Sequence, residues 1–365
     1  MRILYFTTLK ENNDTNMGQW QVVHFINELR NNGWIVDLYF PDDTHSIDEV
    51  NELLMRHVID SRPDLFLSVF NEQTIYPETL LRIADLSVPT VLICFDNLVI
   101  PFEHKKIAKY YSIVWLTSGE TEYLFKSWGA NTIYLPYAAN PNIIINYNGS
   151  SFNNRIAFVG TPYGARKYLL SKIAEKKLPI DIYGNVSEKN NSRVLAGNNK
   201  RKVLLDLLSF PIGRKLLWGT FKYRFLTKDC SPESETVKHM CPVPVSEIPI
   251  IYSEYALSLS STSARNTEVL KNPVPIINLR SFEIPMSYGL QICRYNEELA
   301  KYFDENKEIV FYRDYQELVD KALFYLNPDN YAIVRDMKIA ARRRAENEHT
   351  WTNRFNSLML KIKSL

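Results

Sequence analysis

The chain has 365 residues, of which 45% are hydrophobic and 23% charged, and its formal net charge is +2 at pH 7. This length suits two domains of ordinary size, each with its own core, and the nearly balanced charge excludes a surface tuned throughout to nucleic acid. The scattered cysteines and histidines show no zinc-binding spacing and no apolar run reaches bilayer length, so we expect a cytoplasmic protein, at most peripheral at the inner membrane face.

The first part of the chain alternates short apolar strands with amphipathic helices. We expect strands at 2–7, 34–40, 64–70, 90–95, 113–117 and 132–135, and helices at 19–31, 47–61, 77–86, 102–110 and 119–128. Strands in this alternation that carry almost no charge predict a parallel sheet with helices on both faces. The loop at 10–17 is too long for a dinucleotide fingerprint and lacks its glycines, so no NAD site is expected there.

An asparagine-rich stretch without periodicity divides the chain near residue 141. We predict a first domain at 1–140, a linker at 141–152, a second domain at 153–348 and a final helix at 349–365. The second domain repeats the alternation. Its expected strands are 155–159, 180–183, 247–252, 256–260 and 290–293, and its expected helices are 165–177, 282–288, 318–325 and 331–346. The whole pattern predicts an α/β protein with two doubly wound, Rossmann-like domains.

An insertion at 187–245 interrupts the second domain. Between 189 and 228 it combines many lysines and arginines with leucines and aromatic residues. Three interpretations are open: a solvated helical insertion, a membrane-surface patch that serves a lipid-linked acceptor, and a site for a polyanionic partner. The balanced charge of the whole chain disfavours nucleic acid as that partner.

The stretch 273–303 has the composition of a ligand cradle at the mouth of an α/β sheet. A polar group opens a short helix in it: Asn278, Arg280, Ser281 and Glu283. A helix N-terminus presents unpaired N–H groups to an anion, and an arginine adds bidentate recognition of phosphate oxygens. Glu283, one turn in, is suited to accept hydrogen bonds from the paired hydroxyls of a ribose. The alternative is that Arg280 and Glu283 form only an i, i+3 pair on the protein surface.

Asp96 is the candidate of the first domain. It follows the predicted strand 90–95 at the carboxyl edge of the sheet, where doubly wound folds bind their ligands. We expect it to act as a general base or to contact an acceptor, unless it only caps the turn together with Asn97.

Several stretches carry a resemblance to a known family. They are Phe-Val-Gly-Thr at 158–161 with Arg166, Asn-Leu-Arg-Ser-Phe-Glu-Ile-Pro at 278–285, Glu-Leu-Ala-Lys-Tyr-Phe at 298–303, Lys-Glu-Ile-Val-Phe-Tyr at 307–312, Glu-His-Thr-Trp at 348–351 with Arg354, Phe-Asp-Asn at 95–97 and Leu-Pro-Tyr-Ala-Ala-Asn-Pro at 135–141. With these stretches the chain resembles a GT-B glycosyltransferase, in which two doubly wound domains face each other across a cleft and the final helix crosses back to the first domain. More narrowly, it resembles the bacterial spore-maturation glycosyltransferase-like (CgeB-like) family.

The resemblance implies transfer of a sugar from a nucleotide diphosphate to a glycan or lipid-linked acceptor, in surface polysaccharide or glycoconjugate assembly. Arg280 would neutralise the diphosphate and act in catalysis, and Glu283 would hold the ribose. The remaining donor-binding positions that it implies are Gly160, Thr161, Arg166, Ser281, Phe282 and, unless it is only a helix N-cap, Gly18. It also implies a reaction that needs no metal and no cofactor besides the nucleotide sugar.

One departure from the family pattern concerns stereochemistry. Many retaining members carry two glutamates separated by seven residues, and if Glu283 is the second, the first falls on Pro275. The resemblance favours retention over inversion, but the missing glutamate leaves this open. Two alternatives follow: a catalytically inactive module that still binds nucleotide sugars, and a sugar-nucleotide epimerase of similar architecture.

Overall fold

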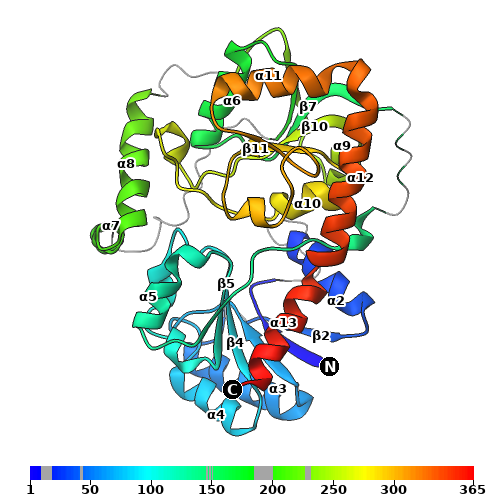
Figure 1. The fold of residues 1–365 in the computed structure, drawn as a ribbon. Coiled ribbons are helices and arrows are strands. Elements are labelled where there is room, and N and C mark those ends of the chain that lie inside the picture. The colour runs from blue at the N-terminus through cyan, green and yellow to red at the C-terminus, as the bar shows by residue number, and fades with distance from the viewer. Residues whose placement is uncertain are drawn as a thin grey trace. The chain divides into compact units, whose positions relative to one another are not determined.

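The structure is a computed structural model that describes residues 1–9, 19–41, 44–144, 147, 149, 151–184, 200–226 and 232–365. The chain divides into two compact units (Figure 1). Unit 1 comprises Met1–Asn140 together with His349–Leu365, and unit 2 comprises Pro141–Glu348.

The described strands of unit 1 form one parallel sheet. They are β1 (Arg2–Phe6), β2 (Ile35–Tyr39), β3 (Leu65–Ser68), β4 (Thr90–Cys94), β5 (Ile113–Leu116) and β6 (Thr132–Tyr134), in the spatial order β2-β1-β3-β4-β5-β6. Strands β3, β4 and β5 are short and fully buried because both of their faces are covered, whereas the edge strand β2 carries Asp37 and is partly exposed. The order reverses between β1 and β3, which makes that point the topological switch of the sheet.

Helices cover both faces of this sheet. They are η1 (Gln21–Ile26, a π-helix), α2 (Asn27–Asn31), α3 (Ile47–Ser61), α4 (Pro77–Asp85), α5 (Glu122–Ser127) and α13 (Trp351–Lys363). One core lies between the sheet and α3, α4 and α5, and a second lies between the sheet and η1, α2 and α13. Ser46 begins α3 with a capping box, since its hydroxyl accepts from the N–H of Glu49 and its own N–H donates to the Glu49 carboxylate.

The C-terminal helix α13 belongs to unit 1. Glu28 of α2 is fully buried, and its carboxylate accepts hydrogen bonds from the N–H groups of Trp351 and Thr352, both at 2.8 Å. The ring of Phe355 stacks on that of Phe25, with 5.4 Å between their centroids. A buried carboxylate at a helix N-terminus satisfies backbone donors that the helix cannot pair itself, so Glu28 fixes where α13 begins.

Unit 2 contains a second parallel sheet in its described residues. Its strands are β7 (Asn153–Val159), β8 (Ile180–Tyr183), β9 (Val237–Met240), β10 (Tyr255–Leu259), β11 (Gln291–Arg294) and β12 (Val310–Tyr312), in the order β12-β11-β10-β7-β8-β9. This is the strand order of a Rossmann sheet, and its switch point lies between β7 and β10.

Helices also lie on both faces of the unit 2 sheet. They are α6 (Ala165–Glu175), α9 (Ile248–Glu254), α10 (Arg280–Met286), α11 (Tyr315–Leu326) and α12 (Tyr331–Glu348). Helices α7 (Lys200–Leu208) and α8 (Pro211–Leu226) pack against each other. The main core joins one face of the sheet to α6, α11 and α12, and a smaller core joins the other face to α9 and α10.

A buried lysine fastens α12 to the rest of unit 2. Lys338 is fully buried, donates hydrogen bonds to the carbonyl groups of Ser253 (2.8 Å) and Tyr255 (2.6 Å), and lies 4.1 Å from the centroid of the Phe152 ring. Burial lowers the pKa of Lys338 from its ordinary 10.5 to about 7. The ammonium form of this side chain is therefore costly in the folded protein.

The structure corrects three expectations about secondary structure. Residues 247–252 were expected to be a strand but belong to α9, because an apolar run with a proline in its first turn also suits a short buried helix. Neither edge strand was predicted: β9, which the insertion supplies, and β12. In place of a helix at 102–110 there are two 3₁₀ turns, Pro101–His104 and Ala108–Tyr110.

Candidate functional site

The carboxyl edge of the unit 2 sheet brings together the residues expected to hold a nucleotide. Gly160 directly follows β7, at the switch point of the sheet, and has a φ of 138°. A Cβ at this position would lie 2.7 Å from Nη2 of Arg280, closer than real contacts allow. Only glycine both adopts this φ and leaves the space, so Gly160 lets the guanidinium of Arg280 lie against the backbone.

Arg280 is the first residue of α10 and is held in a fixed orientation. Its Nε donates a hydrogen bond to the carbonyl oxygen of Val159 at 2.8 Å. Burial opposes its charge, but the nearby Tyr252 and Glu283 hold its pKa above the ordinary value. The arginine is therefore a fixed cation at the edge of the sheet.

A second arginine lies within electrostatic reach of the first. Arg166 of α6 stacks over the ring of Tyr163, with 4.5 Å from its Cζ to the ring centroid, and its Nη1 approaches the carbonyl oxygen of Thr161 at 3.4 Å. Burial lowers the pKa of Arg166, and the positive charge of Arg280 lowers it further. Two partly buried guanidinium groups that repel each other are suited to bind an anion that neutralises both.

The other predicted donor-site residues lie around this pair. Glu283 is 3% exposed, so the alternative of a surface pair with Arg280 is wrong. The hydroxyl of Ser281 is buried and has no hydrogen-bond partner among the described residues. Thr161 is exposed just beyond Gly160. Phe282 is fully buried against Tyr302 and Phe303, so its ring belongs to the core.

The expected helix N-terminus has several backbone donors that are already paired. The N–H of Ser281 bonds to the carbonyl of Asn278, and the N–H groups of Phe282 and Glu283 bond to that of Leu279. The helix is also only seven residues long. Recognition of an anion at this edge therefore falls mainly to side chains.

Two residues of this edge escaped the sequence analysis. Tyr252 of α9 is buried, and its pKa is raised by burial and further by the charge of Glu283. Asn266 accepts a hydrogen bond from the N–H of Ala165 (3.2 Å) through its Oδ1 and donates to the hydroxyl of Thr220 on α8 (3.4 Å) through its Nδ2. Neither residue lies near the arginines in sequence, so no local pattern marks them.

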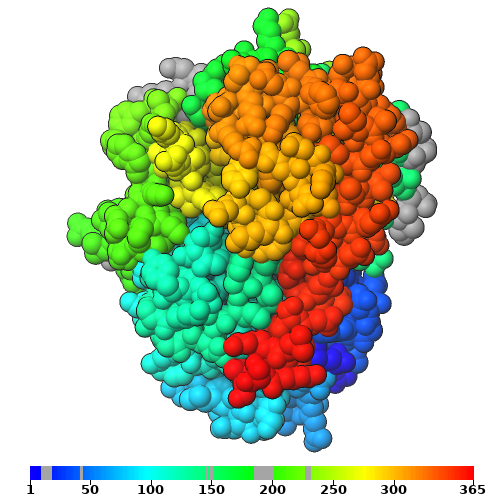
Figure 2. Space-filling view, viewed as in Figure 1, coloured from blue at the N-terminus to red at the C-terminus, as the bar shows by residue number. Residues whose placement is uncertain are grey.

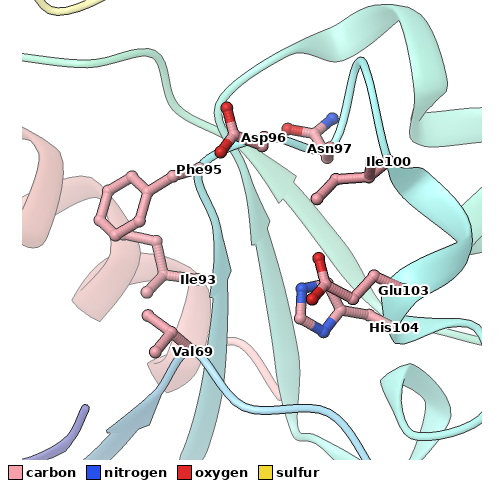
Figure 3. Close-up of a pocket in the computed structure, with 8 residues that line it drawn as sticks. All are labelled: Val69, Ile93, Phe95, Asp96, Asn97, Ile100, Glu103 and His104. Atoms are coloured by element: carbon pink, nitrogen blue, oxygen red, sulfur yellow. The ribbon is translucent and has the colours of Figure 1, made fainter. Parts of the chain in front are cut away.

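The carboxyl edge of the unit 1 sheet contains a pocket of about 150 Å³. Its lining consists of Val69, Ile93, Phe95, Asp96, Asn97, Ile100, Glu103 and His104. Apolar side chains from the ends of β3 and β4 lie along one side, and residues of the following 3₁₀ turn lie along the other (Figure 3). The predicted residue Asp96 thus lines this pocket, together with Glu103 and His104, which were not predicted.

Asn97 supplies the structural support of this pocket. Its Nδ2 donates to the carbonyl of Ser118 (2.6 Å) and to the hydroxyl of Thr121 (2.7 Å), and its Oδ1 accepts from the N–H groups of Thr117 and Ser118, both at 3.1 Å. These bonds tie the end of β4 to the end of β5. The neighbouring Asp96 is exposed, and its carbonyl accepts from the N–H groups that close the turn.

The titratable groups of this pocket are carboxyl groups and an imidazole, whereas the edge of the unit 2 sheet carries two arginines. Burial raises the pKa of Glu103, and the carboxylates of Asp96 and Glu72 raise it further. Burial lowers the pKa of His104 to about 4, so its imidazole is neutral near neutral pH, and its Nδ1 has no hydrogen-bond partner among the described residues. This edge offers carboxylates and a neutral imidazole, groups that bind hydroxyls rather than phosphates.

Three further results concern the described residues as a set. Gly18 lies outside them, as do 187–199 and 227–231 of the insertion. Within the ranges that the structure covers, no group of three or more His, Cys, Asp or Glu side chains is arranged to hold a metal ion. No helix in the described part of the chain has both the length and the apolar character needed to span a bilayer.

Solved structures with the same fold were found over the full length of the chain. A sucrose-phosphate synthase from Thermosynechococcus elongatus has a TM-score of 0.61 and 12% identity, with 100% of both chains covered. The Anabaena protein HepE in complex with UDP and glucose has a TM-score of 0.57 and 12% identity, with 100% of this chain and 99% of that chain covered. A glycosyltransferase from Rickettsia africae scores 0.56 at 10% identity, covering 100% and 98%. The protein therefore has the predicted GT-B fold.

Sequence comparisons identify the family. Among curated proteins, no sequence matches this chain. The profile of the family described as glycosyl transferase-like matches residues 166–359, from Arg166 into α13. The narrower resemblance to the spore-maturation family stays a prediction. Because the match spans more than half of the sequence, the chain belongs to the glycosyl transferase-like family.

Proposed function

We propose that the protein transfers a sugar from a uridine diphosphate donor to a glycan or lipid-linked acceptor, in the assembly of a surface polysaccharide or glycoconjugate. The observation that carries the proposal is the pair of mutually repelling guanidinium groups at the switch point of the unit 2 sheet. The uracil base is proposed because the structurally similar HepE was solved with UDP and with UDP-glucose.

The arginines have the main chemical role in this proposal. When the bond between the sugar and the diphosphate breaks, negative charge grows on the leaving oxygen. Arg280 is already fixed by Val159 and needs no reorientation, so it stabilises that charge as it develops. Arg166 neutralises the other phosphate. Because two guanidinium groups supply the positive charge, we propose that no metal ion is needed, and activity that survives a chelator would support this.

Glu283 and Ser281 are proposed to hold the nucleoside. The Glu283 carboxylate is 3% exposed and acts on both Tyr252 and Arg280, so it belongs to the same electrostatic cluster. A buried carboxylate accepts hydrogen bonds from two ribose hydroxyls at once, and the buried Ser281 hydroxyl adds a further donor or acceptor. Gly160 and Thr161 are proposed to line the diphosphate.

Asp96 is proposed to act on the acceptor. It lines the unit 1 pocket, and its carboxylate carries the charge needed to take a proton from an attacking hydroxyl. Retention of the anomeric configuration is proposed from the resemblance of Glu283 to the second glutamate of retaining enzymes, with the acceptor hydroxyl attacking from the face on which the diphosphate leaves. Product analysis by nuclear magnetic resonance decides between the two anomers.

A ligand screen by thermal shift tests the proposal. The melting temperature of the whole protein is measured with UDP, GDP, TDP, ADP and CMP, since a ligand that binds only the folded state raises it. We expect the largest shift with UDP, and its loss in Arg280→Ala and in Glu283→Ala. Arg335→Ala removes an exposed arginine of unit 2 and is the matched control, which keeps the shift.

Turnover separates the proposal from its alternative. Hydrolysis or transfer is measured with UDP-sugars and a panel of acceptors. UDP binding without any turnover would indicate an inactive nucleotide-sugar-binding module, which the proline at position 275 favours. A UDP shift that survives both substitutions would contradict the assigned donor site, provided that circular dichroism shows both variants folded.

A further inference from the structure

Helices α7 and α8 carry a surface that the proposed reaction does not use. Large apolar side chains on them are 45–66% exposed: Leu204, Leu205, Leu208, Trp218, Phe221, Phe225 and Leu226. We call this set the hairpin surface. Helix α8 lies at the margin of unit 2 (Figure 1), and its outer atoms are visible in green in Figure 2. Soluble surfaces rarely gather so many apolar side chains unless they bind something.

The aromatic members of the hairpin surface form a continuous stripe. Trp218, Phe221 and Phe225 are spaced three and four residues apart, so they share one face of α8. The rings of Trp218 and Phe221 stack with 5.5 Å between centroids, and those of Phe221 and Phe225 lie 4.8 Å apart. The three rings therefore pack against one another although they are exposed to solvent.

The opposite face of α8 is narrow and fixes the helix to unit 2. Gly219 lies against the turn at residues 266–267, where a Cβ would be 3.0 Å from the carbonyl oxygen of Asn266. Gly213 similarly lies against the carbonyl of Leu207 in α7, and Leu216 is buried. An ordinary surface helix turns its bulky apolar side chains inward. Here the small residues face inward and the aromatic ones face outward, so the outer face is available to a partner.

The charge of these helices is strongly one-sided. Residues 200–226 contain seven basic side chains and one acid, Asp206, although the whole chain is nearly neutral at +2. Exposed basic residues lie on both helices: Arg201, Lys202, Arg214, Lys215 and Arg224. A second copy of the same surface would bring like charges together. A nucleic acid would pair with the basic groups but would leave the four leucines in contact with its polar backbone.

We propose that the hairpin surface lies on the surface of an anionic lipid bilayer. Its aromatic rings and leucines enter the boundary between headgroups and acyl chains, and its lysines and arginines pair with headgroup phosphates. This inference stands independently of the proposed sugar transfer, because it concerns residues outside both candidate sites.

Vesicle sedimentation of the full chain tests this inference. Vesicles of phosphatidylcholine alone are compared with vesicles that also contain phosphatidylglycerol, at low and at high salt. We expect binding to the anionic vesicles only, weakened by salt because screening reduces the attraction. Trp218→Ser/Phe221→Ser/Phe225→Ser and, separately, Arg214→Glu/Lys215→Glu should each weaken binding by roughly tenfold or more.

Matched control variants show whether a loss of vesicle binding is specific to the hairpin surface. Leu323→Ser/Phe324→Ser removes exposed apolar side chains from α11, and Lys307→Glu/Arg335→Glu reverses exposed charges elsewhere in unit 2. Both should bind vesicles like the unchanged protein. The substituted side chains of the hairpin surface are exposed, so the unfolding transition should be unaffected, and circular dichroism checks this.

Three results would overturn the inference. The first is equal sedimentation with neutral and anionic vesicles. The second is a dimer in light scattering that dissociates in the triple serine variant without any vesicle binding, which would make the surface a self-association interface. The third is salt-sensitive binding to single-stranded RNA in a protein that ignores vesicles.

Discussion

The carboxyl edges of the two sheets have the same architecture and opposite chemistry. In unit 2 the edge carries Arg166 and Arg280, whereas in unit 1 it carries Asp96, Glu103 and a neutral His104. A doubly wound sheet places ligands at this edge in both cases. The backbone thus decides where a ligand binds, and the few side chains after each strand decide whether it is an anion or a hydroxyl compound.

The two edges are also stabilised differently. In unit 1 the side chain of Asn97 ties two strand ends together through five hydrogen bonds. In unit 2, Gly160 follows β7 at the switch point, and the guanidinium of Arg280 binds the end of β7 itself. The group that fixes the loop in unit 2 is therefore also the group offered to the ligand, whereas in unit 1 the two tasks belong to neighbouring residues.

The largest expected effect comes from Asp96→Asn. If the acidic edge serves the acceptor and the basic edge the donor, this change lowers the rate of sugar transfer by about 10²–10⁴-fold, the usual contribution of a general base. The affinity for UDP, measured by calorimetry, should not change. Asp85→Asn removes an exposed carboxylate of α4 and should leave both quantities unchanged. A loss of UDP affinity in Asp96→Asn would contradict this division of roles.

A second prediction concerns Lys338, the buried lysine of unit 2, and the change of stability with pH. The pKa of Lys338 is about 7 in the folded protein and 10.5 ordinarily, so between these pH values the unfolded state binds the proton and the folded state does not. The free energy of unfolding therefore rises with pH across this window, by roughly 4 to 5 kcal/mol in total, and is flat below it. Lys338→Met should lack this rise in urea unfolding between pH 7 and 9. An unchanged slope would show that the ammonium is not destabilised.

His104 is a buried base of unit 1, and its pKa shift affects stability in a lower pH range than that of Lys338. Its pKa falls from 6.5 to about 4 on folding, so stability is lost as the pH drops from 6.5 toward 4, by about 3 kcal/mol in total. His104→Gln should reduce that loss. Urea unfolding from pH 7 to 4 measures it, with His45→Gln as the control, because His45 is an exposed residue of the same unit.

Gly160→Ala should have a smaller effect on nucleotide binding. The new Cβ would meet the Arg280 guanidinium and would also strain a backbone with φ of 138°. We expect the UDP affinity to fall by roughly tenfold, corresponding to about 1–3 kcal/mol of local strain. Gly33→Ala introduces comparable backbone strain at φ 79° with no atom within 4 Å, so it should reduce stability but preserve UDP affinity.

Much of the fold could be predicted from sequence because its signals are local. The apolar runs that became β3, β4 and β5 are bounded by polar residues and turns, so their limits were found within two residues. The run at 248–254 was misjudged because apolar residues in a short segment suit a buried helix and a strand equally well. The decision there rests on packing against distant residues.

The residues of the candidate site could also be predicted only where their signals are local in sequence. Arg280 and Glu283 are three residues apart in sequence and were found together, whereas Tyr252, Asn266 and His104 reach their places through contacts that no local pattern records. The expectation of free N–H groups at α10 overlooked that the carbonyls of Asn278 and Leu279 already accept from the N–H groups of residues 281–283. Local spacing thus predicts which side chains share an element, but not which hydrogen bonds remain available.

The amide of Asn266 joins two regions that otherwise have separate tasks. Its oxygen caps the start of α6 next to Arg166, and its nitrogen bonds to Thr220 of α8, the helix of the hairpin surface. Through this amide, Asn266 is bonded both to the helix that carries Arg166 and to the helix that carries the aromatic stripe. Its loss would leave the first N–H of α6 and the hydroxyl of Thr220 each without this partner.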